Sequence, residues 1–418
     1  MIMICKLDEK EYQQFQEKHP NSNFLNGVEC GHLEKMEGYP TSYVGYKENN
    51  QLKAVTLLVK MPVMKKFYFF YAPRGFLIDY QDKILLKQFT KELKKFCRKE
   101  KGIFVILDPY ILYKERDQDG DLVENGFNHE YVVENLIQLG YKHKGFSIGY
   151  GKNMQFIRWM YAMDLTEHND KDTLWKELHQ QTRWSINRTL KFHMQVRELT
   201  RDELPLFDNI MKKTGERRHF HSRDLAFYEH QWDAYKEHLK ILLAYIDCDL
   251  YRQSIKNELV KEQANLHKIE EQLESHSSKK IENRKKVSLE AIETFEKKIQ
   301  EVNELESQYG KIIPMAASMF MLYYDEVTYL TSGVYEEFKN YYAPYAIQWI
   351  MIQEAIKLGY KRYNFYGISG EFDRDNENYG VYKFKRGFPG QVEELVGDFL
   401  LPVNPFIYFI YHLLRERD

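Results

Sequence analysis

Paired cysteines are missing from this chain of 418 residues. Its four cysteines lie far apart and form no CxxC pair: Cys5, Cys30, Cys97 and Cys248. This spacing argues against a disulfide framework and against a zinc site built on cysteine pairs. We therefore expect reduced thiols, which are typical of a cytoplasmic protein.

Long hydrophobic runs are missing as well. The longest apolar candidate, Phe406–Leu414, is far shorter than the roughly 20 residues that span a bilayer, and His412 interrupts it. The first residues, MIMICKLDEKEY, become charged at once and lack the apolar centre of a secretory signal. The sequence therefore predicts neither a membrane-spanning helix nor a secretory signal.

No charge of one sign dominates, because 60 basic and 62 acidic residues give a net charge of −2. Any surface for nucleic acid must therefore be a local basic patch. One patch and a predicted helix before it contain such residues: Lys212, Lys213, Arg217, Arg218 and Arg223, with Arg183, Arg188, Lys191 and Arg197 upstream. Phosphates of RNA or of a diphosphate would suit them, but so would a solvated charged face.

Two familiar sites are not supported. His219 and His221 lie in the same basic patch, but no third ligand follows at a usual spacing, so we expect no metal. The pattern GxxxxGK[ST] does not occur, so a P-loop is not predicted.

Glycine and proline are absent from residues 247–309, where Glu, Lys, Gln and Asn dominate. Apolar residues recur there at heptad spacing in two runs, of which Glu262 breaks the first: Ile255, Leu259, Leu266, Ile269 and Leu273, then Ile292, Phe295, Ile299 and Val302. The two runs predict helices of roughly 25 residues, each about 40 Å long, paired as an antiparallel coiled-coil hairpin. A solvated spacer without function is the alternative.

The remaining segments predict an α/β (α+β) fold. Residues 83–101 have helical spacing, and Gly102 then leads into the apolar strand GIFVILDPY. Residues 345–358 repeat the helical pattern before Gly359 and the strand-like KRYNFYG. The repeated unit predicts two related subdomains, of which the hairpin interrupts the second. We place the first in 1–163, the second in 164–246 and 311–418, and the hairpin arm in 247–310.

The apolar run Phe406–Leu414 falls at the end of the predicted second subdomain. It has two interpretations. It could touch a membrane surface, or it could pack against the second subdomain, which is the more common role of a short apolar helix.

Asp108 ends the strand GIFVILDPY. The carboxyl ends of strands in α/β sheets commonly face ligand crevices, where a carboxylate can accept a proton or hold an amine. Capping of the turn before Pro109 is an equally good interpretation.

The stretch YNFYGISGEFDRDNENYGVYKFKRGF combines a strand, a glycine-rich turn, an acid-rich loop and a cationic aromatic segment. Gly367 and Gly370 would let the strand end turn tightly and open a crevice against the backbone. If the last segment is helical, Lys383 and Lys385 face different directions. The acidic loop could repel misplaced RNA phosphate or attract an ammonium group, and the sequence does not decide between them.

Six segments occur in a fixed order around the predicted hairpin: YAPRGFLIDY, GIFVILDPY, FIRW, YNFYGISGEF, GVYKFKRGF and EELVGDF. Over nearly the whole chain they resemble the Fem family of peptidoglycan branch-peptide aminoacyltransferases, of the FemA and FemB type. The resemblance implies two GNAT-like subdomains with a helical hairpin arm. It also implies transfer of Gly, Ser or Ala from aminoacyl-tRNA to the stem-peptide amine or growing bridge of a lipid-linked precursor such as lipid II.

The resemblance assigns residues to the acceptor. Lys35 matches the phosphate-contacting lysine of the family, although the spacing around it differs by one residue. Tyr39 stands where some members have tryptophan. Arg223 matches the phosphate-contacting arginine, so Lys35 and Arg223 are expected to bind the diphosphate.

Catalytic and neighbouring residues follow in the same way. Asp108 matches the strand-end aspartate, and the pair Phe384–Lys385 matches the residues beside the transferred carbonyl. Arg74 and Gly75 match a conserved turn and Arg74 is expected to bind substrate, but Phe76 replaces a proline that relatives often carry. The donor is an activated ester, so no cofactor is expected. The acceptor amine must be neutral, and water, Asp108 or the substrate could take its proton.

Two rival functions stay open. A GNAT-type acetyltransferase would use acyl-CoA, but the [RQ]xxGx[GA] loop of that class does not occur here. A non-catalytic protein could bind tRNA or partners through its arm. As an enzyme, the protein would act in the cytoplasm at the inner face of the plasma membrane, with peripheral membrane contact, as a homodimer or with a related Fem-type partner.

Overall fold

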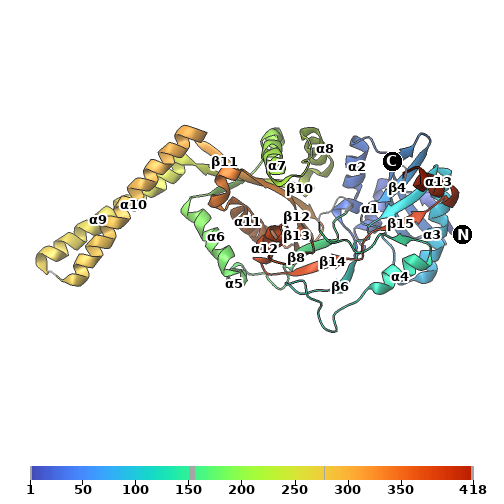
Figure 1. Cartoon of the computed structure of the whole chain (residues 1–418), viewed down its shortest axis with the longest axis horizontal. Helices are drawn as coiled ribbons and strands as arrows, with labels where there is room; N and C mark the ends of the chain where they lie inside the picture. Colours follow the sequence, from blue (N-terminus) through green and yellow to red (C-terminus); the bar gives the residue numbers. More distant parts are fainter. Residues whose placement is uncertain (1, 150–155, 277, 416–418) are drawn as a thin grey trace.

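The computed structural model describes residues 2–149, 156–276 and 278–415. Two β-sheets lie side by side along the long axis of the molecule, and a helical hairpin projects from one end (Figure 1). Helices cover both sheets, so the predicted α/β class with two sheet-centred subdomains and an inserted hairpin is confirmed. No helix of the described residues is long and apolar enough to cross a membrane.

The first sheet has seven strands in the order β1-β2-β3-β4-β5-β15-β7. Its strands are β1 (Ile2–Lys6), β2 (Thr41–Glu48), β3 (Gln51–Met64), β4 (Phe67–Ala72), β5 (Gly102–Leu107), β7 (Lys142–His143) and β15 (Phe399–Pro402). Its helices are α1 (Glu9–Gln16), α2 (Val28–Met36), α3 (Lys83–Lys99), α4 (Glu130–Gln138) and α13 (Pro405–Arg415), with the 3₁₀ turn η1 (Phe24–Asn26). Among the described strands of this sheet, only β4 and β5 pair in parallel, through the crossover helix α3 that the helix–glycine–strand unit predicts.

The second sheet has eight strands in the order β6-β14-β8-β13-β12-β11-β10-β9. They are β6 (Leu112–Glu115), β8 (Trp159–Asp164), β9 (Gln195–Glu198), β10 (Leu239–Asp247), β11 (Ile312–Tyr323), β12 (Glu326–Val334), β13 (Arg362–Ile368) and β14 (Gln391–Leu395). The helices are α5 (Lys171–Glu177), α6 (Gln180–Lys191), α7 (Leu204–Arg218), α8 (Leu225–Tyr235), α11 (Ala343–Leu358) and α12 (Tyr379–Arg386). Three 3₁₀ turns complete it: η2 (Arg201–Glu203), η3 (Lys236–His238) and η4 (Glu336–Tyr341).

The two sheets exchange strands. β6 belongs to residues 1–163 but pairs with β14 in the second sheet, and β15 belongs to residues 311–418 but pairs with β5 in the first. The sequence-based division therefore does not follow the sheets at these two strands, nor at β8, which lies almost wholly in residues 1–163 but pairs with β13 and β14 in the second sheet. The crossing segments lie together, since the backbone N–H of Val396 donates to Ile111 O at 3.0 Å. Both crossings meet at the interface between the subdomains, around Ile111 and Val396, which we call the joint.

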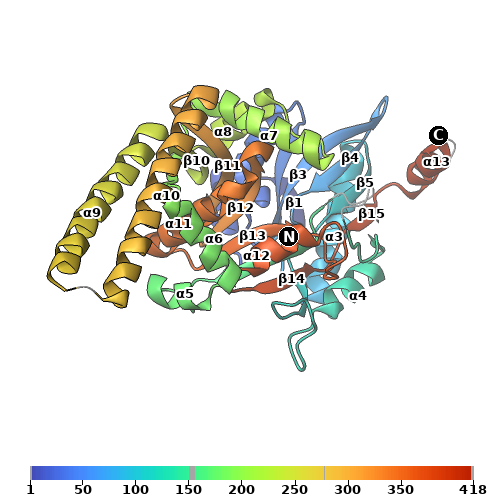
Figure 2. The ribbon, with the colours of Figure 1, turned by 60° about the vertical axis from the view of Figure 1, so that its left-hand side comes forward.

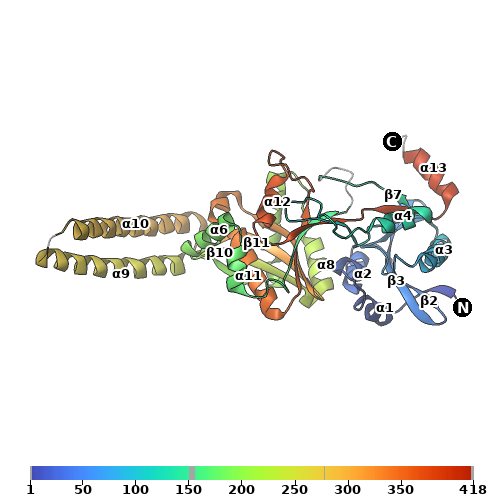
Figure 3. The same ribbon diagram turned by 90° about the horizontal axis from the view of Figure 1, so that it is seen from below.

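The hairpin consists of α9 (Cys248–Ser275) and α10 (Lys279–Tyr309), which lie alongside each other far beyond the sheets (Figure 3). It is inserted between β10 and β11, which still pair directly, with Asp247 opposite Ile312. Ile255 and Val302 are buried at its base in the core of the second subdomain. Glu262, which breaks the apolar seam, accepts a hydrogen bond from the buried Ser288 hydroxyl. The periodic pattern thus predicted both helices and the interruption of their apolar seam at Glu262.

The C-terminal helix α13 packs against the first sheet, where Phe104 of β5 contacts the rings of Tyr408 and Tyr411 at 5.7 and 5.5 Å. The expectation that this run packs against the second subdomain is wrong. The reason is β15, which carries the chain back to the first sheet immediately before α13. The helix stands out from the body at its end (Figure 2).

Candidate active site

Asp108 follows β5 and lies at the joint between the subdomains. Its Oδ1 accepts hydrogen bonds from the backbone N–H of Arg74 at 2.8 Å and from the Tyr71 hydroxyl at 3.1 Å. Its Oδ2 lies 3.3 Å from Arg74 Nη1. Burial raises the pKa of Asp108 to about 6, although the Arg74 guanidinium and the hydrogen bonds oppose the shift. Both carboxylate oxygens of Asp108 are therefore already engaged.

Arg74 is enclosed by the joint, with only 2% of its surface exposed. It has a left-handed φ of 52°, and a Cβ on the following Gly75 would lie 2.7 Å from Pro109 Cα. Besides Asp108, the side chain reaches Ile157 O at 3.1 Å and stacks 5.6 Å from the Tyr110 ring. Arg74, expected to bind substrate, thus ties the first subdomain to the segment that enters the second sheet.

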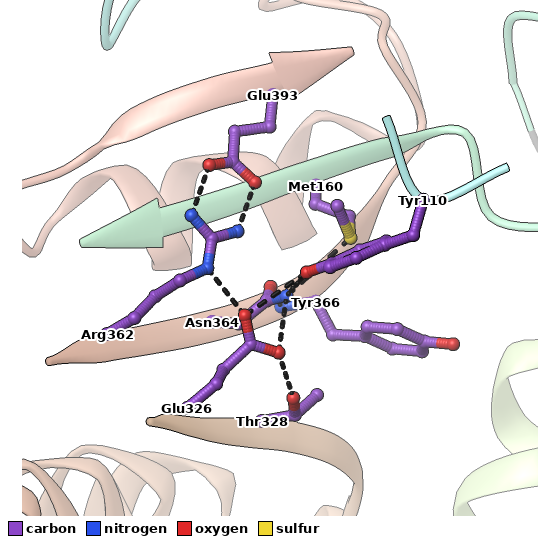
Figure 4. Close-up of polar contacts among 8 residues, drawn as sticks. All are labelled: Tyr110, Met160, Glu326, Thr328, Arg362, Asn364, Tyr366 and Glu393. Carbon is purple, nitrogen blue, oxygen red and sulfur yellow. Dashed lines mark hydrogen bonds and ion pairs between the residues drawn. The ribbon is translucent and has the colours of Figure 1, made fainter. Parts of the chain in front are cut away.

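A partly buried polar network continues from Tyr110 into the second sheet (Figure 4). The Tyr110 hydroxyl donates to Glu326 at 3.1 Å, and the Asn364 amide donates to the same carboxylate at 3.3 Å. Arg362 lies between Glu326 and Glu393 and pairs with both. Burial opposes ionisation of Glu326, but the Arg362 charge and the hydrogen bonds outweigh it and hold the pKa of Glu326 below its usual value. The network fixes the joint beside Asp108.

Lys385 lies on α12, between β12 and β13. These strands pair in parallel only as far as Thr328 and Asn364, and then diverge. Lys385 fills the wedge: its Nζ donates to Gly367 O at 2.6 Å and lies 5.9 Å from the centre of the Tyr329 ring. Burial lowers the pKa of Lys385 to about 7. The fold thus holds an amine out of water at the carboxyl end of β13.

Phe384 faces the other side of α12. It packs edge-on against Tyr345 at 4.8 Å and lines a surface pocket between α12, α6 and α11. Lys383 is exposed and lines the same pocket, as do Arg374 and His179. Lys383 and Lys385 therefore face different directions, as helical spacing predicts, but Lys383 shares its surroundings with Phe384. A cationic, aromatic pocket of this kind suits a nucleic-acid strand.

The expected acceptor residues lie on or next to α2 and α8, two helices that pack against each other. Lys35 is exposed, lies 3.4 Å from Glu9 and stacks over Tyr43. Arg223 is also exposed, just before α8, and lies over the Phe227 ring at 4.6 Å. The two helices are tied by His230 and Glu37.

His230 Nδ1 of α8 lies 2.7 Å from the Glu37 carboxylate at the end of α2. Arg223 is close enough to Glu34, the neighbour of Lys35, to oppose the rise that burial causes in the pKa of Glu34. Tyr39 is half-buried at the end of α2, where its N–H donates to Glu34 O at 2.8 Å.

The groups are linked across the joint. Cys30 of α2 is close enough to Asp108 that the carboxylate adds to the rise that burial causes in the pKa of its thiol. On the other side, Tyr366 interacts with Arg74, and Gly367 next to it accepts from Lys385. One continuous region therefore runs from α2 through Asp108 and Arg74 to Lys385.

Comparisons with known proteins agree with this arrangement. The FemAB family model matches residues 7–416. The chain belongs to the FemAB family. It is 34% identical over 417 residues to the aminoacyltransferases FemA of Staphylococcus epidermidis and Staphylococcus aureus, covering 99% of this chain and 99% of each relative. A crystal structure of FemX has the same fold, with a TM-score of 0.81 and 24% identity over 97% of this chain and 99% of that chain.

In this member of the FemAB family, sequence reasoning missed Asp398. It lies in EELVGDF, a segment that carried the resemblance but was given no chemical role. The available signal was an acid beside a glycine, directly before the apolar run FLLP, whereas Asp108 directly follows its apolar run. Asp398 directly precedes β15 and follows Gly397, whose φ is +87°. Among the described residues, no group of three or more His, Cys, Asp or Glu side chains is placed to hold a metal ion.

Proposed function

We propose that this protein transfers Gly, Ser or Ala from aminoacyl-tRNA to an amine of a peptidoglycan precursor, either on the stem peptide or on the growing bridge. The observation that carries the proposal is the full-length likeness to relatives that are named aminoacyltransferases. The position of Lys385 supports it, because in its protonated form a buried lysine beside the reacting carbonyl can stabilise the oxyanion of acyl transfer.

The chemistry follows from the donor. The aminoacyl ester is already activated, so neither ATP nor a cofactor is required. Attack by the acceptor amine produces a tetrahedral intermediate with a negative oxygen. The Lys385 ammonium has three N–H donors, and Gly367 O occupies one of them, so two are left for that oxygen. Phe384 and the cationic pocket beside it hold the 3′ end of the tRNA.

The acceptor lies on the other side of the joint. Lys35 and Arg223 are exposed cations on neighbouring elements, and they bind the diphosphate of the lipid-linked precursor. Tyr39 shapes the wall beside them. Asp108 and Arg74 fix the joint between acceptor and donor, rather than contacting the diphosphate.

A lipid-linked acceptor places the enzyme at the inner face of the plasma membrane, and α13 gives it a contact surface. One side of this helix packs on the first sheet through Tyr408. The other side exposes apolar residues: Phe406, Phe409, Ile410, Leu413 and Leu414. The cluster under α13 also includes Met64 and Phe67, which flank the cations Lys65 and Lys66 of the β3–β4 turn. Apolar rings beside cations suit an anionic bilayer.

The described residues of the hairpin project away from the joint (Figure 3). We therefore assign the hairpin to tRNA contact or to self-association, as a homodimer or with a related Fem-type partner. Its surface is rich in Lys and Glu, and the projecting position leaves both helices accessible (Figure 1).

Single-turnover transfer from charged tRNA tests the proposal. Loss of the aminoacyl group from tRNA and its appearance on the acceptor supports a transferase, whereas tRNA binding without transfer supports a scaffold. Thermal-shift titration with coenzyme A tests the acetyltransferase alternative, which predicts a dose-dependent rise in Tm.

A further inference from the structure

Asp398 lies beside Asp108. Strand β15 pairs antiparallel with β5, with Phe399 opposite Leu107, so the next pair in this register is Asp398 and Asp108. Residues opposite each other on antiparallel strands have Cβ atoms about 4.5–5.5 Å apart on the same face. The sheet joint therefore holds two carboxylates side by side.

The residues two positions away along β5 and β15 show on which face of the sheet Asp108 and Asp398 lie. Ile106 and Leu400, two residues from Asp108 and Asp398, belong to one apolar cluster together with Tyr71. Side chains two residues apart on a strand point to the same side, so both carboxylates lie on that face. This agrees with the hydrogen bond from the Tyr71 hydroxyl to Asp108.

The two carboxylates differ in the number of hydrogen bonds and ion pairs that they form. Asp108 is buried and uses both oxygens to hold Arg74 and Tyr71. Asp398 is only partly buried, and within the described part of the chain no hydrogen bond or ion pair reaches its carboxylate. Only its backbone carbonyl is used, accepting from the N–H of Lys144 at 2.9 Å. Within the described residues, both oxygens of the Asp398 carboxylate are therefore available to accept a proton, whereas both oxygens of Asp108 are already engaged.

Charged groups face Asp398 from every side of the joint. Asp108 comes from β5, Arg74 follows β4, Lys144 follows β7 and Arg158 precedes β8. Burial raises the pKa of Asp398 to about 7, and the Asp108 charge adds to the rise, while the three cations oppose it. A base with a pKa near the working pH is the most effective kind.

We infer that Asp398 accepts the proton of the acceptor amine, and that Asp108 is a positioning residue that orients Arg74 beside it. The acceptor ammonium gives one proton to the Asp398 carboxylate and becomes a neutral amine. Its nitrogen bonds to the ester carbonyl carbon, the bond from that carbon to the tRNA oxygen breaks, and the second proton of the nitrogen passes to the leaving oxygen. Asp398 then releases its proton to water. This role rests on the proposed transfer function.

The carboxylate pair can be tested without substrates. Aspartate labelled with ¹³C at Cγ, assigned by comparison with Asp398→Asn, should show a resonance that titrates near pH 7. Asp108→Asn should lower that pKa by one unit or more, because it removes a neighbouring negative charge. A resonance that titrates near pH 4 in the wild-type chain, or one that Asp108→Asn leaves unmoved, would overturn the pair. This result does not depend on any transferase activity.

The proton-accepting role is tested by transfer kinetics. Asp398→Asn should lower kcat about 10²–10⁴-fold at pH 7 with an unchanged tRNA Kd. It should also abolish the rise of kcat on the acid side of the pH optimum, while the fall on the alkaline side, where Lys385 loses its charge, should remain. Asp398→Glu should restore part of kcat and the pH-dependent rise, which a folding defect would not explain. Asp202→Asn, at an exposed aspartate of η2 with no role in the proposed site, is the matched control and should keep wild-type kcat. A normal kcat and pH profile in Asp398→Asn would refute the assignment, even if the pair titrates as expected.

Discussion

At the scale of one residue, burial of the Lys385 amine destabilises the folded state. Burial lowers its pKa from 10.5 to about 7, so between these values the unfolded chain binds a proton that the folded chain does not. Stability therefore rises as pH increases from about 7 to 10.5, and at pH 7 the buried amine costs most of that free energy.

Replacing the amine should separate these two effects. Lys385→Met should lower kcat about 10²–10³-fold, because one partner of the oxyanion is lost. It should also raise the free energy of unfolding at pH 7 by roughly 1–4 kcal/mol, because each pKa unit corresponds to about 1.4 kcal/mol. Single-turnover transfer measures the change in rate, and urea unfolding measures the change in the free energy of unfolding.

Lys383→Met is the matched control for this change. Lys383 is exposed in the Phe384 pocket, so its loss should weaken tRNA binding and leave kcat and stability close to wild type. Equal kcat values in the two variants would remove Lys385 from the mechanism.

The acceptor cations can be tested in the same way. Lys35→Ala or Arg223→Ala should each raise the KM of the lipid-linked acceptor roughly 10–100-fold, because a charge-assisted contact to phosphate contributes about 1.5–3 kcal/mol. The tRNA Kd should not change. Lys87→Ala, an exposed lysine of α3, is the control. An unchanged acceptor KM in both Lys35 and Arg223 variants would refute the diphosphate site.

The residues of the site were predictable to different degrees. Helical spacing placed Lys383 and Lys385 on different sides of α12, because that relation is local. The burial of Arg74 could not be predicted, since it depends on contacts with Asp108, Ile157 and Tyr110 across the joint. Asp398 was missed because its neighbour Asp108 is far away in the sequence and is brought to it only by the β5–β15 pairing.

At the scale of elements, the hairpin was predictable because its signal is periodic and local. The strand exchange was not, because β6 and β15 leave the subdomains that their sequence neighbours form. The absence of glycine and proline over a long segment indicates a helix. No local pattern, in contrast, predicts which sheet a short apolar strand joins.

The hairpin should be dispensable for chemistry. A Gly/Ser linker in place of residues 260–290 keeps Ile255 and Val302, which belong to the subdomain core. We expect weaker tRNA binding or fewer subunits per particle in solution, with the thermal unfolding of the two subdomains unchanged. Filter binding and light scattering measure these. If neither tRNA affinity nor mass responds, the arm has another role.

The exposed side of α13 should bind anionic bilayers. Phe406 and Phe409 are 72% and 60% exposed, and full burial of one such side chain contributes about 1.5–3 kcal/mol. Phe406→Ser with Phe409→Ser should therefore reduce sedimentation with phosphatidylglycerol–phosphatidylcholine vesicles at least tenfold. Val260→Ser with Val287→Ser, on the exposed hairpin, is the control for lost apolar surface. Equal sedimentation of the two folded variants and the wild type would reject membrane contact.

At the scale of the whole molecule, the site depends on two subdomains held in one arrangement. The network of Glu326, Arg362 and Glu393 and the pairing of Arg74 with Asp108 lie at the joint, where the acceptor and donor regions that we propose meet. The strand exchange ties the subdomains further, because each sheet contains a strand from the other part of the chain. The arm and α13 project from opposite ends of this body (Figure 1).

The most direct test of the account is mass spectrometry of a lipid II acceptor incubated with the protein and a mixture of charged tRNAs. We predict a product heavier by one Gly, Ser or Ala residue, formed only when the tRNA is charged and strongly reduced with Lys385→Met. An acceptor mass that stays unchanged with every charged tRNA, or that rises by an acetyl group when acetyl-CoA is supplied, would contradict it.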